Sequence, residues 1–326
     1  MHEAIVVSVI IPTFNRQETL KTALAALFKQ DYPHNKYEII VVDDYSSDAT
    51  KETVLNLAKT TEVALFYYAN DKTKGQLTAR NLGFTKAKAE FVASTDDDMW
   101  VDEHWLKTGL AYFTSSDIAA VEGKVIALDP KEGPFYHNMS MQGKTFPTGN
   151  IFYRKSILEQ TGGLDPELNL WHNYGSHYCL GLKILATGKN IVYADDLLAY
   201  HPSYEMKAIT VIKNSFKSGA IAYIYKTYGR AAIPYLGFKV YRLIVSLLVI
   251  SFLISLIFVN YLAALIALFA LLAMMIIVIP SFIKTGLLTQ CKVLAVYSIS
   301  YLFATFSFFY GCLRYRVMPN KNMLRL

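Results

Sequence analysis

The chain has 326 residues, enough for one large domain or two smaller ones, and its hydrophobic fraction of 53% is high for a purely soluble protein. Three widely spaced cysteines, Cys179, Cys291 and Cys312, exclude both a disulfide framework and a zinc site. The net charge of +6 is modest, and the basic residues cluster near apolar C-terminal segments, which favours an anionic membrane surface over nucleic acid as a partner.

The first hundred residues alternate between short apolar runs and helical patterns. Four runs predict buried strands, at residues 7–11, 38–42, 63–68 and 90–94. The spacing of apolar residues between them predicts helices at 20–28, at 54–58 with a cap within 46–48, and at 77–87. This alternation implies an α/β fold with a parallel sheet covered on both faces. In such sheets, ligands bind outside the carboxyl ends of the strands.

Polar side chains, together with the aromatic Phe14, follow three of these strands. They are Thr13, Phe14 and Asn15 after the first strand, Asp43 and Asp44 after the second, and Asp96, Asp97 and Asp98 after the fourth. Clustered carboxylates at a sheet edge are costly unless a cation is present, and a divalent ion takes oxygen ligands and commonly keeps phosphate as another. Alternatively, Asp97 or Asp98 caps a helix suggested by residues 103–106. The convergence at strand ends favours a metal–nucleotide site.

Together, these and later segments resemble glycosyltransferase family 2 over roughly residues 7–202. The segments are VSVIIPTFNR (7–16), VVDDYSSD (41–48), ARNLG (79–83), the three aspartates, TGNIFYRK (148–155) and TGGLD (161–165). The resemblance implies a GT-A (Rossmann-like) catalytic domain at residues 1–204. It also implies binding of a nucleotide-sugar and transfer of the sugar to an acceptor hydroxyl, usually with inversion.

The resemblance assigns roles to individual residues. Those implied in substrate binding are Thr13, Phe14, Asn15, Asp44, Arg80, Asp96, Asp97, Gly149 and Asn150. Among them, Thr13 and Phe14 would line the base pocket, and Asp44 would bond the base edge. Arg80 would lie near the base or the diphosphate, Asp96 or Asp97 would face the ribose, and Gly149-Asn150 would form the turn that faces the donor sugar.

The resemblance also implies a metal cofactor. Asp98 would bind Mg²⁺ or Mn²⁺ bridging the donor diphosphate, and His201 would be a C-terminal metal or phosphate contact. A metal that neutralises charge on the leaving nucleoside diphosphate lowers the barrier without proton transfer.

One departure from the family pattern concerns the general base. The family usually carries a Glu-Asp pair before a segment like 180–183, and here that pair falls on Ser176 and His177. His177 itself is one candidate base, which its intrinsic pKa of about 6.5 permits. Alternatively, the acceptor is a phosphate, such as a polyprenyl phosphate, that needs no base. A third explanation is an impaired enzyme that retains nucleotide-sugar binding.

The segment 205–242 is basic, aromatic and amphipathic. Ile209, Ile212 and Phe216 form an apolar stripe, with Lys213 and Lys217 beside it. This pattern is typical of a helix that lies in the membrane interface with snorkelling lysines; the alternative is a solvated helix docked on the domain.

Residues 243–326 predict membrane helices. Residues 243–283 carry no charge, and a span takes ~20 apolar residues, so we expect two spans that break at Asn260 and Tyr261. Basic residues flank both ends of this stretch, which predicts a hairpin with both ends in the cytoplasm. Basic residues also follow the third apolar segment, 293–313, so we favour a helix packed on the hairpin or in the interface over a third span.

The sequence therefore predicts a multi-pass protein of the inner cell membrane with a cytoplasmic catalytic domain, since the N-terminus offers no signal peptide. We expect an inverting, metal-dependent glycosyltransferase acting from a nucleotide-diphosphate sugar onto a lipid-linked or exported glycan. A polyprenyl-phosphate glycosyltransferase and a catalytically impaired nucleotide-sugar-binding protein are the alternatives.

Overall fold

The computed structural model describes residues 4–72, 74–229, 238–257, 261–279, 287–319 and 323–325. The chain divides into two units. The N-terminal unit comprises Met1–Asp129, Asn138–Asn169 and Ser176–Ser203, and the C-terminal unit comprises Pro130–His137, Leu170–Gly175 and Tyr204–Leu326.

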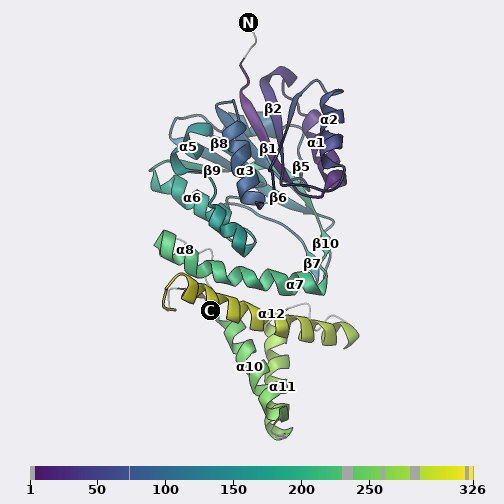
Figure 1. The fold of residues 1–326 in the computed structure, drawn as a ribbon, viewed down its shortest axis with the longest axis vertical. Coiled ribbons are helices and arrows are strands. Elements are labelled where there is room, and N and C mark those ends of the chain that lie inside the picture. Colours follow the sequence, from purple (N-terminus) through teal and green to yellow (C-terminus); the bar gives the residue numbers. More distant parts are fainter. Residues whose placement is uncertain are drawn as a thin grey trace. The chain divides into compact units, whose positions relative to one another are not determined.

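An eight-stranded sheet forms the N-terminal unit, in the order β3-β2-β1-β4-β8-β6-β9-β5 (Figure 1). The strands are β1 (Val7–Thr13), β2 (Tyr37–Asp43), β3 (Ala64–Ala69), β4 (Phe91–Thr95), β5 (Trp100–Val101), β6 (Ile118–Leu128), β8 (Asn150–Arg154) and β9 (Asn190–Pro202). Strands β1 to β4 are parallel to one another, which confirms the predicted α/β class. The sheet then changes direction, because β8 runs antiparallel between β4 and β6.

Helices cover both faces of this sheet. They are α1 (Gln17–Phe28), α2 (Thr50–Ala58), α3 (Gln76–Lys86), α4 (Trp105–Ala111), α5 (Lys155–Thr161) and α6 (Ser176–Ala186), with short 3₁₀ helices η1 (His34–Lys36) and η2 (Pro166–Trp171). Successive side chains of a strand point to opposite faces. Val9 and Ile11 of β1 share a core cluster with Leu24 of α1. Ile10 instead faces α3, where a Cβ at Gly83 would lie 2.3 Å from Ile10 Cγ2, so only glycine lets α3 pack this closely.

The parallel strands bring their polar carboxyl ends to one edge of the sheet. Thr13 pairs with Asp43 in register, and the backbone N–H of Asp44 donates to the carbonyl of Thr13 at 2.9 Å. The helix-cap alternative for the aspartates is wrong: α4 begins at Trp105, after β5, and Asp102 accepts from the backbone N–H of His104 at 3.0 Å. Asp97 and Asp98 thus lie at the strand edge and not at a helix start.

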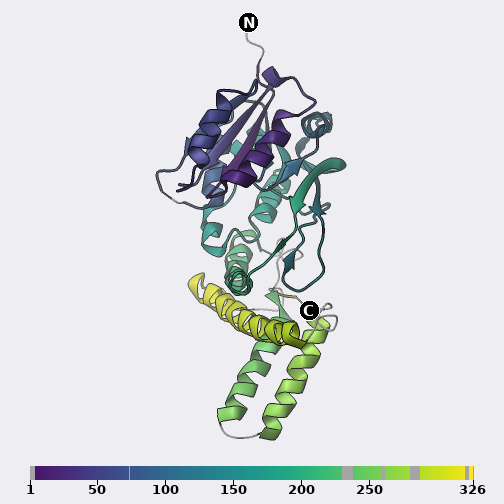
Figure 2. The same ribbon diagram turned by 90° about the vertical axis from the view of Figure 1, so that its right-hand side faces the viewer.

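Helices dominate the C-terminal unit. They are α7 (Ala208–Asn214), η3 (Ser215–Gly219), α8 (Ala220–Tyr228), α10 (Val240–Ile257), α11 (Tyr261–Val278) and α12 (Leu287–Arg314), with the paired short strands β7 (Tyr136–His137) and β10 (Tyr204–Glu205), and β11 (Phe238–Lys239) and β12 (Leu324–Arg325). Figure 2 shows α10 and α11 as an antiparallel pair, with α12 crossing them near one end.

Small residues let α12 approach the α7–η3–α8 segment closely. The hydroxyls of Ser215 and Ser300 are hydrogen-bonded, and the backbone N–H of Gly219 donates to Ser307 Oγ at 3.1 Å. The buried side of α7 carries Val211, whereas Ile209 is exposed. Val211 belongs to the core cluster that includes Val293 and Val296 of α12, and the placement of the Ile209 stripe in a membrane interface stays a prediction.

One helix among the described residues, Leu288–Arg314 of α12, has both the length and the mean hydropathy (1.6) of a membrane span. The apolar helices Tyr241–Ser255 and Leu262–Val278 are shorter. The stretch 243–283 carries the two expected helices, α10 and α11, and their crossing of a membrane stays a prediction.

Candidate functional site

A pocket of about 320 Å³ lies at the carboxyl ends of β1, β2 and β4. The residues that line it come from three strand ends and from the start of α3. The lining residues are Pro12, Thr13, Phe14, Arg16, Asp44, Gly75, Gln76, Ala79 and Asp97. Four residues predicted from the sequence, Thr13, Phe14, Asp44 and Asp97, therefore meet in one cavity.

Asp97 is buried at the carboxyl edge of the sheet and forms part of the pocket wall. Thr13 Oγ1 donates to Asp97 Oδ2 at 2.7 Å, and Arg16 Nη1 donates to Asp97 Oδ1 at 3.0 Å. Burial raises the pKa of Asp97 to about 6, against the opposing charge of Arg16 and the hydrogen bond from Thr13. The side chain is thus held in place by its neighbours at one side of the pocket.

Asp98 and His201 come together from distant parts of the chain. His201, buried on β9, has Nε2 at 3.8 Å from Asp98 Oδ2, and Arg16 is ion-paired with the same Asp98 oxygen. An imidazole nitrogen and a carboxylate oxygen at this separation suit one Mg²⁺ or Mn²⁺ that takes its other ligands from phosphate and water. No group of three or more His, Cys, Asp or Glu side chains among the described residues could hold a metal ion without such help.

Asp44 fixes the loop that closes the pocket. Its carboxylate accepts hydrogen bonds from Asn70 Nδ2 at 2.7 Å and from the backbone N–H groups of Lys74 and Gly75, each at 2.9 Å. Gly75 has φ +91°, a conformation that favours glycine. Asp44 therefore shapes the pocket wall as well as lining it.

Phe14 and Asn15 follow β1 directly. The Phe14 side chain is 46% exposed and lines the pocket, so a planar base can stack on it. Asn15 adopts φ 52°, and its Oδ1 accepts from the backbone N–H of Ser47 at 2.8 Å. Asn15 joins the first strand end to the second.

Arg80, predicted to lie near the base or diphosphate, is only 1% exposed and is not part of the pocket lining. Its guanidinium donates to Ser94 Oγ at 2.5 Å, to the carbonyl of Thr148 at 3.0 Å and to the Asp96 carboxylate. In the described structure Arg80 orients Asp96 and anchors the residues before Gly149.

Gly149 lies directly over Asp96. A Cβ at this position would lie 2.3 Å from Met99 Sδ and 2.6 Å from Asp96 Oδ2, so a side chain is excluded. Asn150 is fully buried; it accepts from Trp105 Nε1 at 2.7 Å and donates to the carbonyls of Lys124 and Leu197, both at 2.9 Å. Its side chain supports the turn from inside the protein.

His177 lies in the first turn of α6. Its ring centroid is 4.3 Å from that of Tyr178. Burial lowers the pKa of His177 to about 4, and the charge of Asp96 opposes this shift only in part. The imidazole is thus neutral at pH 7, and the charge of Asp96 would stabilise only its protonated form.

Sequence reasoning assigned no role to Arg16. Arg16 follows Thr13, Phe14 and Asn15 directly and ends the first family-like segment. A cation so near the strand-end carboxylates was the signal that could have identified it.

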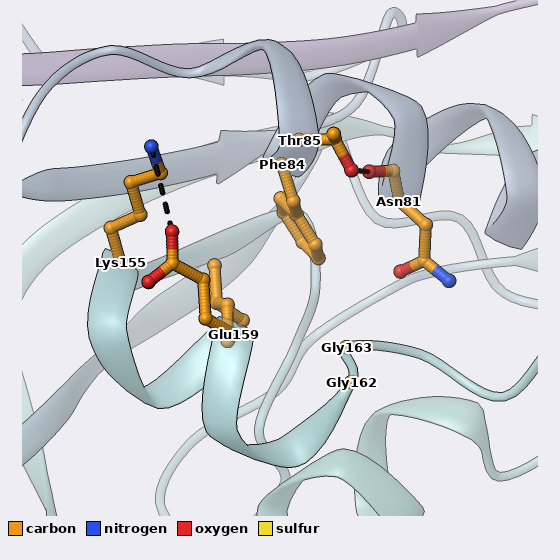
Figure 3. A pocket seen from close by; sticks show the side chains of 8 residues that line it. Asn81, Phe84, Thr85, Lys155, Glu159, Gly162 and Gly163 are labelled. Carbon is orange, nitrogen blue, oxygen red and sulfur yellow. Dashed lines mark hydrogen bonds and ion pairs between the residues drawn. The ribbon is translucent and has the colours of Figure 1, made fainter.

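A second pocket, of about 240 Å³, lies between α3 and α5 (Figure 3). Its lining includes Asn81, Gly163 and the Lys155–Glu159 ion pair, whose charged atoms are 3.6 Å apart. No strand-end aspartate lines it. We therefore place the candidate site at the aspartates.

Comparison with known proteins agrees with this geometry. A family model described as glycosyl transferase family 2 matches residues 8–183, more than half of the chain. Glycosyltransferase AglE of Haloferax volcanii is 28% identical over 224 residues, which cover 65% of this chain and 71% of that protein. A GalNAc(5)-diNAcBac-PP-undecaprenol beta-1,3-glucosyltransferase of Campylobacter jejuni is 42% identical over 91 residues, covering 28% of this chain and 29% of the relative.

Solved structures show the same fold. The mannosyltransferase PcManGT of Pyrobaculum calidifontis, in complex with GDP-Man and Mn²⁺, has a TM-score of 0.56 at 17% identity and covers 95% of this chain and 86% of its own. TarS of Staphylococcus aureus, in complex with UDP-GlcNAc, has a TM-score of 0.56 at 19% identity and covers 72% of each chain. The N-terminal unit thus has the predicted GT-A fold, and the chain belongs to glycosyltransferase family 2.

Proposed function

We propose that this protein is a membrane-associated, inverting glycosyltransferase that moves a sugar from a nucleotide-diphosphate sugar to a lipid-linked or exported glycan. The observation that carries the proposal is the meeting of Thr13, Phe14, Asp44 and Asp97 in one pocket, with Asp98 and His201 3.8 Å apart at the same edge. The Campylobacter relative's name specifies a polyprenol-diphosphate-linked acceptor, which supports the acceptor class.

Each residue has a role in this proposal. The base stacks on Phe14 and bonds to Asp44, and the ribose lies against Asp96 or Asp97. Asp98 and His201 hold Mg²⁺ or Mn²⁺, which supplies positive charge to the leaving diphosphate when bound. The Gly149-Asn150 turn faces the donor sugar, and Gly149 packs against Asp96 with no space for a side chain.

The C-terminal unit supports membrane association. Large apolar side chains are exposed along both helices of the α10–α11 pair, for example Leu247, Leu253, Leu262 and Phe269. Water disfavours so much contiguous apolar surface, and hydrocarbon does not. We propose that this pair inserts as a hairpin with both ends in the cytoplasm, and that α7, η3 and α8 lie in the interface.

The metal assignment is tested by Asp98→Ala, with Asp117→Ala as the matched control, because Asp117 is ion-paired with Lys189 at 3.0 Å outside the pocket. Radiolabel transfer is measured with a panel of uridine- and guanosine-diphosphate sugars and membrane lipid extract. We expect transfer and metal-dependent nucleotide binding to be lost in Asp98→Ala and retained in Asp117→Ala. Full activity of Asp98→Ala would refute the metal assignment.

A polyprenyl-phosphate glycosyltransferase is the second candidate, and α6 favours it. This helix carries no acidic residue in its first turn, and His177, whose pKa is lowered to about 4, is a weak base. An acceptor that is already ionised needs no base. Transfer to purified polyprenyl phosphate, without transfer to a diphosphate-linked oligosaccharide, would establish this candidate over the first. Nucleotide binding without transfer to either acceptor would identify a non-catalytic binding protein.

A further inference from the structure

Arg16 links the start of α1 to two of the three aspartates. Its Nη1 atom donates to Asp97 Oδ1 at 3.0 Å and is also ion-paired with Asp98 Oδ2. Its side chain is 50% exposed and forms part of the pocket wall. The guanidinium therefore lies between the carboxylates and the space in which a nucleotide would lie.

Among the described residues, Arg16 is the only arginine or lysine that is ion-paired with Asp97 or Asp98. Carboxylates this close repel one another, and a cation between them relieves the repulsion. Arg80 meets the same need at Asp96 but is buried, with its guanidinium bonded on several sides. Arg16 differs because half of its side chain is exposed to solvent. Its guanidinium can therefore move away from the aspartates without leaving an empty cavity in the protein.

The position of Arg16 conflicts with a metal ion at Asp98. Asp98 Oδ2, the oxygen nearest His201 Nε2, is also the oxygen that Arg16 holds. An ion bound to that oxygen would take the place of the guanidinium and repel its charge. A released guanidinium in the pocket has a natural partner, since arginine binds phosphate oxygens through a planar pair of donors.

We propose that Arg16 is a donor-positioning residue that neutralises Asp97 and Asp98 in the free enzyme and moves to the donor's diphosphate when the divalent ion binds. This inference rests on the metal-dependent donor binding proposed above. It makes the binding of metal and nucleotide cooperative. The metal releases Arg16, the released Arg16 holds the diphosphate, and each ligand therefore raises the affinity for the other.

The first test measures Mn²⁺ binding to the detergent-solubilised full chain without nucleotide, by electron paramagnetic resonance. We expect Arg16→Ala to bind Mn²⁺ about tenfold more tightly than the unsubstituted protein, because the competing cation is gone. Lys21→Ala is the matched control. Lys21 lies on the same helix, is ion-paired with Glu18 at 3.0 Å and does not line the pocket. Its removal should leave Mn²⁺ affinity unchanged.

The second test measures nucleotide affinity in saturating Mn²⁺ by calorimetry, with UDP and GDP in parallel. We expect Arg16→Ala to weaken binding of the nucleoside diphosphate about tenfold and binding of the monophosphate much less, since the lost contact is to the diphosphate. Arg16→Lys, which keeps the charge, should recover part of the loss. Metal affinity and nucleotide affinity thus change in opposite directions, which a misfolded variant would not show.

The outcomes separate this inference from the function it rests on. Suppose that the unsubstituted protein shows nucleotide-dependent Mn²⁺ binding and that Arg16→Ala binds Mn²⁺ no more tightly. This result would overturn the role of Arg16 and leave the proposed function standing. Equal losses of diphosphate and monophosphate binding would do the same. If the unsubstituted protein binds no Mn²⁺ with either nucleotide, the metal-dependent function and the role of Arg16 both fail.

Discussion

The three consecutive aspartates have three different sets of partners. Asp96 is held by Arg80 and accepts a hydrogen bond from Gln76 Nε2 at 3.3 Å. Asp97 binds Thr13 and Arg16, and Asp98 faces Arg16 and His201. Neighbouring residues with the same chemistry thus have separate environments, because the chain turns sharply between β4 and β5.

His177 gives a prediction about stability and pH. In the unfolded chain its pKa is about 6.5, and burial lowers it to about 4 in the folded protein. The unfolded state therefore binds more protons between these values, so the contribution of this residue to stability is present above pH 6.5 and is lost as the pH falls toward 4. The contribution is on the order of 3 kcal/mol.

The measurement compares the free energy of unfolding of the unsubstituted protein and His177→Gln at pH 7 and pH 4.5. We expect the substituted protein to lose less stability on acidification. An identical loss in both proteins would show that the pKa of His177 is not lowered in the folded protein.

At the scale of elements, two of the family-like segments are hydrogen-bonded to each other. Asn81 of α3 donates from Nδ2 to the carbonyl of Leu164 at 2.7 Å, and its Oδ1 accepts from the backbone N–H of Leu164 at 2.9 Å. Gly163, with φ +66°, leaves room for this pair, since a Cβ there would lie 2.6 Å from Asn81 Oδ1. The ARNLG and TGGLD segments therefore join α3 to the turn after α5.

Asn150 joins β8 to β6, β9 and α4, and its removal should destabilise the N-terminal unit. Asn150→Ala leaves Trp105 Nε1 and the carbonyls of Lys124 and Leu197 buried without this partner. We expect the free energy of unfolding to fall by about 3 kcal/mol. Denaturant titration measures this, with the exposed Asn190→Ala as control, for which we expect less than ~0.5 kcal/mol. Equal losses would contradict a structural role for the buried amide.

At the scale of the whole molecule, the exposed apolar surface of α10 and α11 predicts binding to membranes. Leu253→Asp combined with Phe269→Asp places one carboxylate on each helix, at a cost of ~3 kcal/mol each if the helices are inserted. We expect this variant to lose flotation with phospholipid vesicles.

Leu185→Asp is the matched control for the membrane prediction, because Leu185 is an exposed leucine in the N-terminal unit. Its flotation should be unchanged. If the double variant floats as well as the control, the α10–α11 pair is not the membrane anchor.

The sequence by itself determined the parallel half of the sheet and the strand ends that carry Thr13, Asp44 and the aspartates. Strand and helix periodicity are local signals, and parallel strands place their carboxyl ends at one edge. Only the tertiary structure decided that β8 is antiparallel, that Arg80 and Asn150 are buried, and that Arg16 holds Asp97 and Asp98. These facts depend on tertiary contacts: Arg16 and Asp97 are 81 positions apart, and Trp105 and Asn150 are 45 positions apart. Side-chain spacing along the chain does not encode such contacts, because packing between distant segments selects them.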